Sequence, residues 1–283
     1  MAELVEGGSL ENCFAPHGVT GVRIPIPPPE IMLIDLENIS NARDLGGMEA
    51  AGGKKIKPRM LLRSSALFGA SNNDIEKLKN EYNLAHVVDF RTEDERLEKP
   101  HEISKFEDVK YSFLNSFNKI QTEVTRDKKS EYLLLKTADK LTEDDAIEII
   151  ESFYNQLPHI DSLNDAYRKF FEILINNKEG SVLWHCSLGK DRAGIAAVLI
   201  EHVLGVNYLN ILTDYLLTNE HLNQNISRST SNAFRVFYGV RESFLEKWYE
   251  AVDKNYGNID NYLNKVLNVD NEKIEFLRNK FLE

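Results

Sequence analysis

Val182-Leu-Trp-His-Cys-Ser-Leu-Gly-Lys-Asp-Arg-Ala-Gly194 is the stretch of this sequence that says most about its fold and its chemistry. The apolar run 181–185, which follows Gly180, is typical of a buried strand. Residues 193–204 are apolar nearly all round, which predicts a buried helix that ends at Gly205. The backbone N–H groups of the intervening loop and of the helix start can converge on one point. The stretch therefore predicts a loop that binds a tetrahedral oxyanion.

Cys186 and Arg192 give this loop a specific chemistry. The dipoles that bind an oxyanion also stabilise a thiolate at their centre. The guanidinium of Arg192 offers planar, paired donors that match two phosphate oxygens. A thiolate in such a loop can attack an in-line phosphorus atom, which predicts a phospho-cysteine intermediate.

Two alternatives compete for the same stretch. Cys186 could be an ordinary buried cysteine, since unpaired cysteines are among the most buried residues. That interpretation does not explain a glycine three residues on, an arginine six residues on and a helix start directly after. A rhodanese-like sulfur-transfer loop, which also places a cysteine between strand and helix, is the nearer rival.

Strands and helices alternate around this loop. Short apolar or alternating runs predict strands at 60–63, 85–90, 109–114 and 181–185. Helical spacing predicts helices at 73–82 with an Asn73 cap, 145–157 after a capping signal at Thr142, 160–177, 193–204, 208–222, 240–252, 259–266 and 272–282. The pattern predicts an α/β fold: a central, mostly parallel sheet flanked by helices, with a helical C-terminal part.

Two segments depart from this alternation of strands and helices. Residues 1–30 include Ile24-Pro-Ile-Pro-Pro-Pro-Glu30, which must be extended, and we expect an N-terminal arm there. A docking ligand for an SH3-like domain is the alternative. Residues 31–283 are expected to form a single domain. Within it, a polar insertion at about 118–158 predicts a lid over the site, and a solvated insertion without function is the alternative.

Composition limits the class of protein. With 42% hydrophobic and 28% charged residues among 283, the chain is globular. The net charge of −11 argues against broad electrostatic binding of nucleic acid. Cys13 and Cys186 cannot form a disulfide framework, the start lacks a signal-peptide pattern, and no apolar run is long enough to span a membrane. We expect a cytoplasmic protein, with export by a route that needs no signal peptide left open.

Five blocks of sequence resemble a known family. His185-Cys-Ser-Leu-Gly-Lys-Asp-Arg192 resembles the Cys-x5-Arg signature of cysteine-based phosphatases. Its Gly-Lys-Asp-Arg ending is similar to the bacterial and fungal tyrosine/serine phosphatase family, which includes phosphoinositide-active members. The other blocks are Asn41-Ala-Arg-Asp-Leu-Gly-Gly47, Leu62-Arg-Ser-Ser65, Val87-Val-Asp-Phe-Arg91 and Asp214-Tyr-Leu-Leu-Thr-Asn219. The resemblance as a whole covers residues 38–225. Ala42 stands where the family usually has an aromatic residue.

The resemblance implies a cysteine-phosphatase fold and a role for each loop residue. It makes Cys186 the nucleophile, Arg192 the clamp on the transition state and Asp191 the general acid. Asp161 is the rival acid, because dual-specificity enzymes carry theirs upstream, and the sequence has no Trp-Pro-Asp loop. The phosphoryl oxygens would be held by backbone amides of Ser187, Leu188, Gly189, Lys190, Asp191 and Arg192.

Other residues are assigned supporting roles. His185 is expected to hydrogen-bond the loop. Asp89 and Arg91 either line the pocket or form a structural salt bridge. The resemblance places Arg43, Asp44 and Arg63 around the loop, where they would support it without touching the substrate.

Two positions in and after the loop are expected to affect the substrate or the reaction. Lys190 either contacts a second phosphate of the substrate or only screens Asp191. Ala193 replaces the Ser or Thr of most relatives, so the hydroxyl that would hydrogen-bond the departing thiolate is missing.

The expected activity is hydrolysis of phosphate monoesters without metal or cofactor. Phosphotyrosine is the first candidate substrate, with phosphoserine/threonine and phosphoinositides beside it. The expected partners are therefore a phosphorylated protein or a phosphoinositide, with no nucleic acid, no membrane span and at most transient contact with anionic lipid. A phosphate-recognition module without turnover, or a sulfurtransferase, is the alternative function.

Overall fold

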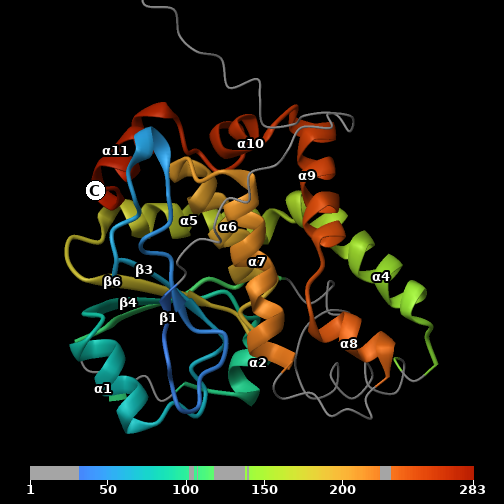
Figure 1. Ribbon diagram of the computed structural model, residues 1–283, viewed down its shortest axis with the longest axis horizontal. Helices are drawn as coiled ribbons and strands as arrows, with labels where there is room; N and C mark the ends of the chain where they lie inside the picture. The colour runs from blue at the N-terminus through green and yellow to red at the C-terminus, as the bar shows by residue number, and fades with distance from the viewer. Residues whose placement is uncertain (1–31, 102–104, 107, 118–137, 139, 224–230) are drawn as a thin grey trace, which may run out of the picture.

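One six-stranded sheet organises the protein (Figure 1). The computed structural model describes residues 32–101, 105–106, 108–117, 138, 140–223 and 231–283. The strands lie in the order β1-β2-β3-β6-β4-β5. Their bounds are β1 Met32–Leu33, β2 Arg43–Asp44, β3 Leu61–Ser64, β4 Leu84–Asp89, β5 Lys110–Phe113 and β6 Ser181–His185. The pairs β3–β6, β6–β4 and β4–β5 are parallel, and the pairs β1–β2 and β2–β3 are antiparallel. The prediction of a mostly parallel sheet is confirmed.

Helices connect and cover the strands close to the predicted positions. Their bounds are α1 Asn72–Asn80, α2 Glu93–Glu98, α4 Glu143–Gln156, α5 Asp161–Asn176, α6 Arg192–Leu204, α7 Tyr208–Asn223, α8 Asn232–Tyr238, α9 Glu242–Tyr256, α10 Ile259–Lys265 and α11 Asn271–Phe281. Two details correct the prediction. Ser71, not Asn73, caps α1, because its side chain accepts from the Asp74 N–H in a capping box. The short helices α2 and α8, of six and seven residues, were not predicted, since such short segments carry little periodic signal.

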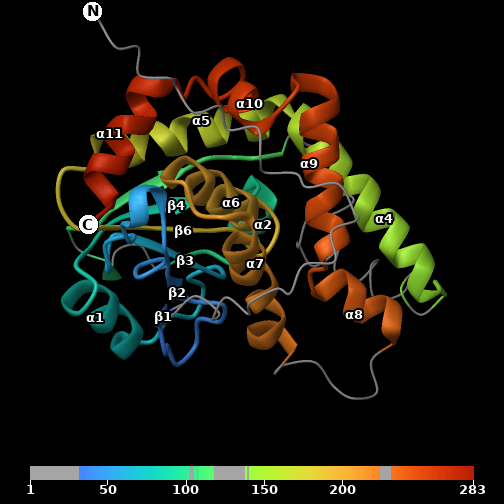
Figure 2. The same cartoon turned by 45° about the horizontal axis from the view of Figure 1, so that its top comes forward.

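The sheet separates two apolar layers, with α5 and α6 on one face and α1 on the other (Figure 2). Successive residues of a strand point to opposite faces. In β6, Val182 and Trp184 therefore join the larger core with α5 and α6, whereas Leu183 joins the smaller core with α1. This two-sided burial places the end of β6 in the interior of the molecule.

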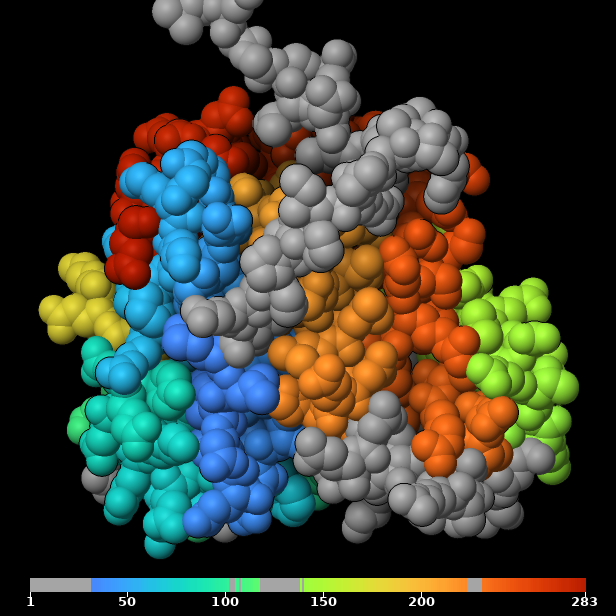
Figure 3. Space-filling view, viewed as in Figure 1, coloured from blue at the N-terminus to red at the C-terminus, as the bar shows by residue number. Residues whose placement is uncertain are grey.

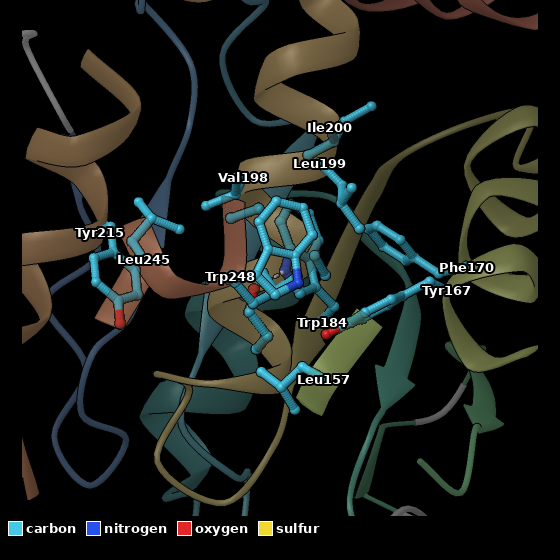
Figure 4. Close-up of a cluster of buried hydrophobic side chains, with 14 of the residues drawn as sticks. Leu157, Tyr167, Phe170, Trp184, Val198, Leu199, Ile200, Tyr215, Leu245 and Trp248 are labelled. Carbon is cyan, nitrogen blue, oxygen red and sulfur yellow. Dashed lines mark hydrogen bonds between the residues drawn. The ribbon is translucent and has the colours of Figure 1, made fainter. Parts of the chain in front are cut away.

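The larger core is built around Trp184. Figure 4 shows the cluster in which side chains of β6, α5, α6 and α9 meet. The ring of Phe170 lies 5.1 Å from that of Trp184. The indole N–H donates to the carbonyl oxygen of Ala193 at 3.0 Å, so the buried polar group is satisfied. The contact also holds the start of α6 against β6, the two elements that flank the candidate site.

The predicted insertion at 118–158 has two parts. Residues 118–137 and 139, where a lid was expected, lie outside the described residues, as does the N-terminal arm, 1–30. Residues 143–156 form α4, which begins at the predicted Thr142 cap and buries Ala146, Ile150 and Tyr154. Helix α4 packs against α8 and α9 and forms one flank of the molecule (Figure 3). The last part of the predicted lid is thus a packed helix.

The helical C-terminal part closes onto the rest of the domain. Helix α6 ends at Gly205, whose φ of 78° lies in the left-handed region, as expected. Helix α11 packs on α5 and α6, and Leu282 then pairs with Ile56 in an antiparallel bridge. Among the described residues, no helix combines the length and apolar character needed to cross a membrane.

Candidate active site

The loop between β6 and α6 lies where three parallel strands end. His185, the last residue of β6, pairs with Ser64 of β3 on one side and Asp89 of β4 on the other. Backbone bonds continue this pairing into the loop, from the Phe90 N–H to the His185 carbonyl oxygen at 2.9 Å and from the Ala66 N–H to that of Ser187 at 3.1 Å. The edge formed by the carboxyl ends of parallel strands is the usual place for a ligand site in an α/β sheet.

Gly189 allows the loop to turn against β3. Its φ is 73°, and a Cβ atom there would lie 2.3 Å from the carbonyl oxygen of Ser64. Arg63 donates to the Gly189 carbonyl oxygen at 2.7 Å, and Asn41 donates to that of Leu188 at 2.9 Å. Two loop carbonyls are therefore engaged by side chains from the β1–β2 connection and β3.

A buried charged cluster supports the loop from behind. Asp214 accepts from Arg43 and from Arg63, each at 2.6 Å, and all three side chains are almost fully buried. Burial opposes the charge of Asp214, but the two arginines outweigh it and hold the pKa of Asp214 below its ordinary value. Burial and the neighbouring Asp214 raise the pKa of Glu201, on α6, well above its ordinary value. Two carboxyl groups this close share a proton more readily than they both ionise.

The expected residues Arg43 and Arg63 thus lie behind the loop, whereas Asp44 has another role. The Asp44 carboxylate accepts from the backbone N–H groups of Gly46 at 2.9 Å and Arg59 at 2.6 Å. These contacts close the connection between β2 and β3. No described contact links Asp44 to the loop.

Cys186 and Arg192 lie at the two ends of the loop. Cys186 is 1% exposed and unpaired, and Arg192 is 4% exposed as the first residue of α6. The Arg192 guanidinium donates to both oxygens of Glu95, at 2.7 and 2.9 Å. Burial opposes its charge, but Glu95 raises the pKa of Arg192 above its ordinary value. Arg192 is therefore fixed in place as a cation.

Glu95 is a site residue that the sequence analysis missed. It is the third residue of α2 and completes a capping box with Thr92. Besides Arg192, it accepts from the Ser187 hydroxyl at 2.7 Å, so one carboxylate ties both ends of the loop. Burial would raise the pKa of Glu95, but Arg192 lowers it well below the ordinary value. The capping-box spacing after the Asp89-Phe-Arg91 block was the available signal for a helix start here.

Asp191 is held by its neighbours in a defined position. Its Oδ1 atom accepts from Lys190 Nζ and from the Tyr154 hydroxyl, both at 2.8 Å. Asp191 precedes α6 without capping it through its side chain, so the carboxylate is turned to other partners. Lys190 is fully buried, and this geometry favours the role of screening Asp191.

The rival acid lies elsewhere. Asp161 begins α5 and is exposed. Its described electrostatic neighbour is Tyr256 on α9, whose hydroxyl donates to the Pro158 carbonyl oxygen. The described contacts bring Asp191, not Asp161, to the loop.

Asp89, Arg91 and His185 form a buried network beside the loop. Arg91 donates to both oxygens of Asp89, with a closest distance of 2.8 Å, so the expected salt bridge is present. Arg91 also lines a pocket with Glu95, Ser187 and other residues, namely Ala66, Lys99, Leu188 and Tyr238. His185 Nδ1 lies 3.0 Å from the Cys186 carbonyl oxygen, which matches its expected contact with the loop.

Asp89, His185 and the nearby His101 have the composition of a metal site, but their carboxylate is already engaged. One ligand atom from each of Asp89, His101 and His185 lies within 4.8 Å of the others. Both Asp89 oxygens already accept from Arg91, and one also accepts from the Tyr111 hydroxyl at 2.7 Å. A cation there would compete with a buried guanidinium for the only carboxylate of the group, so we assign the cluster a structural role.

The fold and the site together define a class. A mostly parallel sheet places a Cys-x5-Arg loop before a buried helix, and the buried carboxylate of Glu95 holds both Arg192 and the loop. This is the arrangement of an α/β phosphatase. The chain belongs to the tyrosine phosphatase family, which it matches over residues 34–283. The match extends beyond the blocks recognised in the sequence and includes the C-terminal helices.

Curated relatives agree with this assignment. A Cupriavidus necator protein with the provisional name tyrosine-protein phosphatase is 31% identical over 277 residues, which cover 92% of this chain and 93% of that protein. The triple specificity protein phosphatase PtpB of Mycobacterium tuberculosis is 25% identical over 140 residues, 42% of this chain and 50% of that protein. A tyrosine-protein phosphatase of Nostoc commune is 33% identical over 73 residues, 22% of this chain and 25% of that protein.

Proposed function

We propose that this protein hydrolyses phosphate monoesters through a phospho-Cys186 intermediate and without a metal ion. The observation that carries the proposal is the loop itself. Cys186 and Arg192 stand at its two ends, and Glu95 joins Ser187 to Arg192 across it. A guanidinium held beside a cysteine in this way can bind the oxygens of a phosphoryl group in transfer.

The reaction has two steps. The Cys186 thiolate attacks phosphorus, the bond to the ester oxygen breaks, and Asp191 gives its proton to the leaving oxygen. Asp191, now ionised, takes a proton from water as that water attacks the phospho-cysteine. The S–P bond breaks, and phosphate and the thiolate are released. Arg192 balances the charge on the phosphoryl oxygens in both steps.

Phosphotyrosine is the substrate that family membership supports first. Phosphoserine, phosphothreonine and phosphoinositides are added because the partly matching mycobacterial relative is named for triple specificity. The proposal includes action in the cytoplasm and transient contact with anionic lipid, in keeping with the sequence expectations.

Turnover of 4-nitrophenyl phosphate in the presence of EDTA tests the activity. We expect hydrolysis by the wild type and none above background by Cys186→Ser. Equal rates for the two proteins would refute the enzyme function and leave a phosphate-recognition module. Conversion of thiosulfate and cyanide to thiocyanate would instead support the sulfurtransferase. A panel of phosphopeptides and phosphoinositides then ranks the substrates.

A further inference from the structure

Two buried tyrosines form a hydrogen-bonded chain that ends on Asp191. The Tyr215 hydroxyl, on α7, donates to the Tyr154 oxygen at 2.8 Å. The Tyr154 hydroxyl, on α4, donates to Asp191 Oδ1 at 2.8 Å. Both tyrosine side chains are fully buried. Three elements far apart in the sequence thus converge on the carboxylate that precedes α6.

Packing holds the two phenols in place, and burial keeps them protonated. The Tyr154 ring lies 5.7 Å from that of Phe244 on α9 and 6.4 Å from that of Tyr215. Burial raises the pKa of both Tyr154 and Tyr215 well above the ordinary value, so both phenols keep their protons. Tyr154 therefore carries the proton that it donates to Asp191, and this hydrogen bond favours the ionised carboxylate over the protonated acid.

We propose that Tyr154, supported by Tyr215, is the positioning residue that aims the Asp191 carboxyl group during phosphoryl transfer. The inference rests on the proposed role of Asp191 as general acid. When Asp191 gives its proton to the leaving oxygen, the Tyr154 hydrogen bond stabilises the carboxylate that results. The same bond keeps that carboxylate in place until it takes a proton from the attacking water. Tyr154 itself transfers no proton.

The charged and titratable groups that face Asp191 set the background for this effect. The cations are Lys190 and Arg192, and the neutral phenols are Tyr154 of α4, Tyr167 of α5 and Tyr215 of α7. Tyr167 is engaged differently, because its hydroxyl donates to the Arg192 carbonyl oxygen at 2.9 Å. Of the three tyrosines, Tyr154 has a described hydrogen bond to the carboxylate, and Tyr215 acts through Tyr154.

The dependence of kcat/KM on the leaving group distinguishes a positioning role of Tyr154 from a role in packing alone. A good leaving group such as 4-nitrophenolate departs with little protonation, whereas phenolate needs the acid. Because kcat/KM reports on the first chemical step, it is the quantity to compare. We expect Tyr154→Phe to lower kcat/KM about ten-fold for phenyl phosphate but only about two-fold for 4-nitrophenyl phosphate.

The pH profile gives a second readout. The basic limb of the Tyr154→Phe profile should move to higher pH, since the Asp191 carboxyl group then keeps its proton to higher pH. Tyr215→Phe should act in the same direction and more weakly.

Tyr262→Phe is the matched control. Tyr262 is equally buried and donates one hydrogen bond, to Asn164 at 2.6 Å, without contact to Asp191. Tyr262→Phe should lower the thermal stability about as much as Tyr154→Phe does, while its kcat/KM values for both substrates stay near those of the wild type. Equal losses on both substrates by Tyr154→Phe, or an unshifted pH profile, would overturn the positioning role.

Asp191→Asn separates this inference from the proposed function. It should show a larger leaving-group-dependent loss than Tyr154→Phe. If it shows none while Cys186→Ser is inactive, Asp191 is not the acid and the inference falls, but the phospho-cysteine function stands. If the wild type itself has no turnover, the proposed function fails.

Discussion

The carboxylate of Glu95 is the counter-charge of Arg192. It accepts two hydrogen bonds from Arg192 and one from Ser187, and it is 2% exposed. Removal of one partner from a buried ion pair leaves the other charge uncompensated. The position of Arg192 therefore depends on a residue 97 positions earlier in the sequence.

Glu95→Gln keeps the shape of this contact and removes its charge. We expect an unfolding free energy lower by about 1–3 kcal/mol and a kcat/KM for aryl phosphates lower by about ten-fold or more. Thermal unfolding and initial rates measure the two effects. Glu93→Gln is the control, because Glu93 pairs with Arg96 at the surface and should change neither quantity by much. Wild-type values for Glu95→Gln would show that Arg192 needs no counter-charge.

Ala193 leads to a prediction about the second step. It is fully buried at the start of α6, and an alanine side chain cannot donate to the departing sulfur of Cys186. A hydrogen bond to a charged group is worth about 1.5–3 kcal/mol, or roughly ten- to a hundred-fold in rate. We expect breakdown of the intermediate to be slower than its formation.

Rapid mixing with an aryl phosphate should then show a burst close to one equivalent per site, and Ala193→Thr should shrink the burst and raise kcat. The added atoms must fit a packed position, so thermal unfolding is measured alongside. Absence of a burst, with no gain from threonine, would mean that another donor already serves the departing sulfur.

At the scale of elements, the loop between β6 and α6 is shaped by β3. Gly189 has a positive φ and lies against the Ser64 backbone. Gly69 also has a positive φ, 77°, but a Cβ atom there would have no neighbour within 4 Å. The two glycines therefore separate the cost of the backbone conformation from that of the close approach.

Gly69→Ala should cost about 1 kcal/mol in unfolding free energy, as expected for the conformation alone, and leave activity intact. Gly189→Ala carries the same cost and also displaces the loop from β3, so we expect a kcat/KM at least about a hundred-fold lower. Steady-state rates and thermal unfolding of both variants check this. Equal behaviour of the two variants would show that the contact with Ser64 does not shape the site.

At the scale of the whole molecule, buried charges link the helices to the sheet. Glu201 on α6 and Asp214 on α7 lie with Arg43 and Arg63 in one buried cluster. Because its pKa is raised, Glu201 keeps a proton in the fold that the unfolded chain releases. Its contribution to stability is complete below the unfolded pKa, about 4.3, and declines as pH rises from there toward the folded pKa.

Glu201→Gln removes this dependence, since glutamine stays neutral. We expect the difference in Tm between Glu201→Gln and the wild type to grow in favour of the variant from pH 5 to pH 8. The exposed Glu148 provides the control, and Glu148→Gln should follow the wild type across this range. A difference that is constant with pH would mean that Glu201 is ionised in the fold.

Local patterns were sufficient for the loop and for the two elements that flank it. The apolar run of β6, the glycine loop and the all-apolar α6 follow one another directly, so neighbouring residues determine them. The strands β1 and β2 have two residues each and carry no periodicity of their own. They form because Arg43 and Asp44 pair with β3, which is a contact between distant parts of the chain.

The sequence by itself determined the four parallel strands β3, β4, β5 and β6, the loop between β6 and α6, and the placement of Cys186 and Arg192 at the ends of that loop. These depend on hydrophobic periodicity and on the spacing of residues that are close along the chain. Only the tertiary structure decided which side chains surround them. Glu95 reaches Arg192 from α2, and Tyr154 reaches Asp191 from α4. The physical reason is that a charge or a phenol acts on whatever lies within hydrogen-bond distance, and that distance is set by the packing of helices on the sheet.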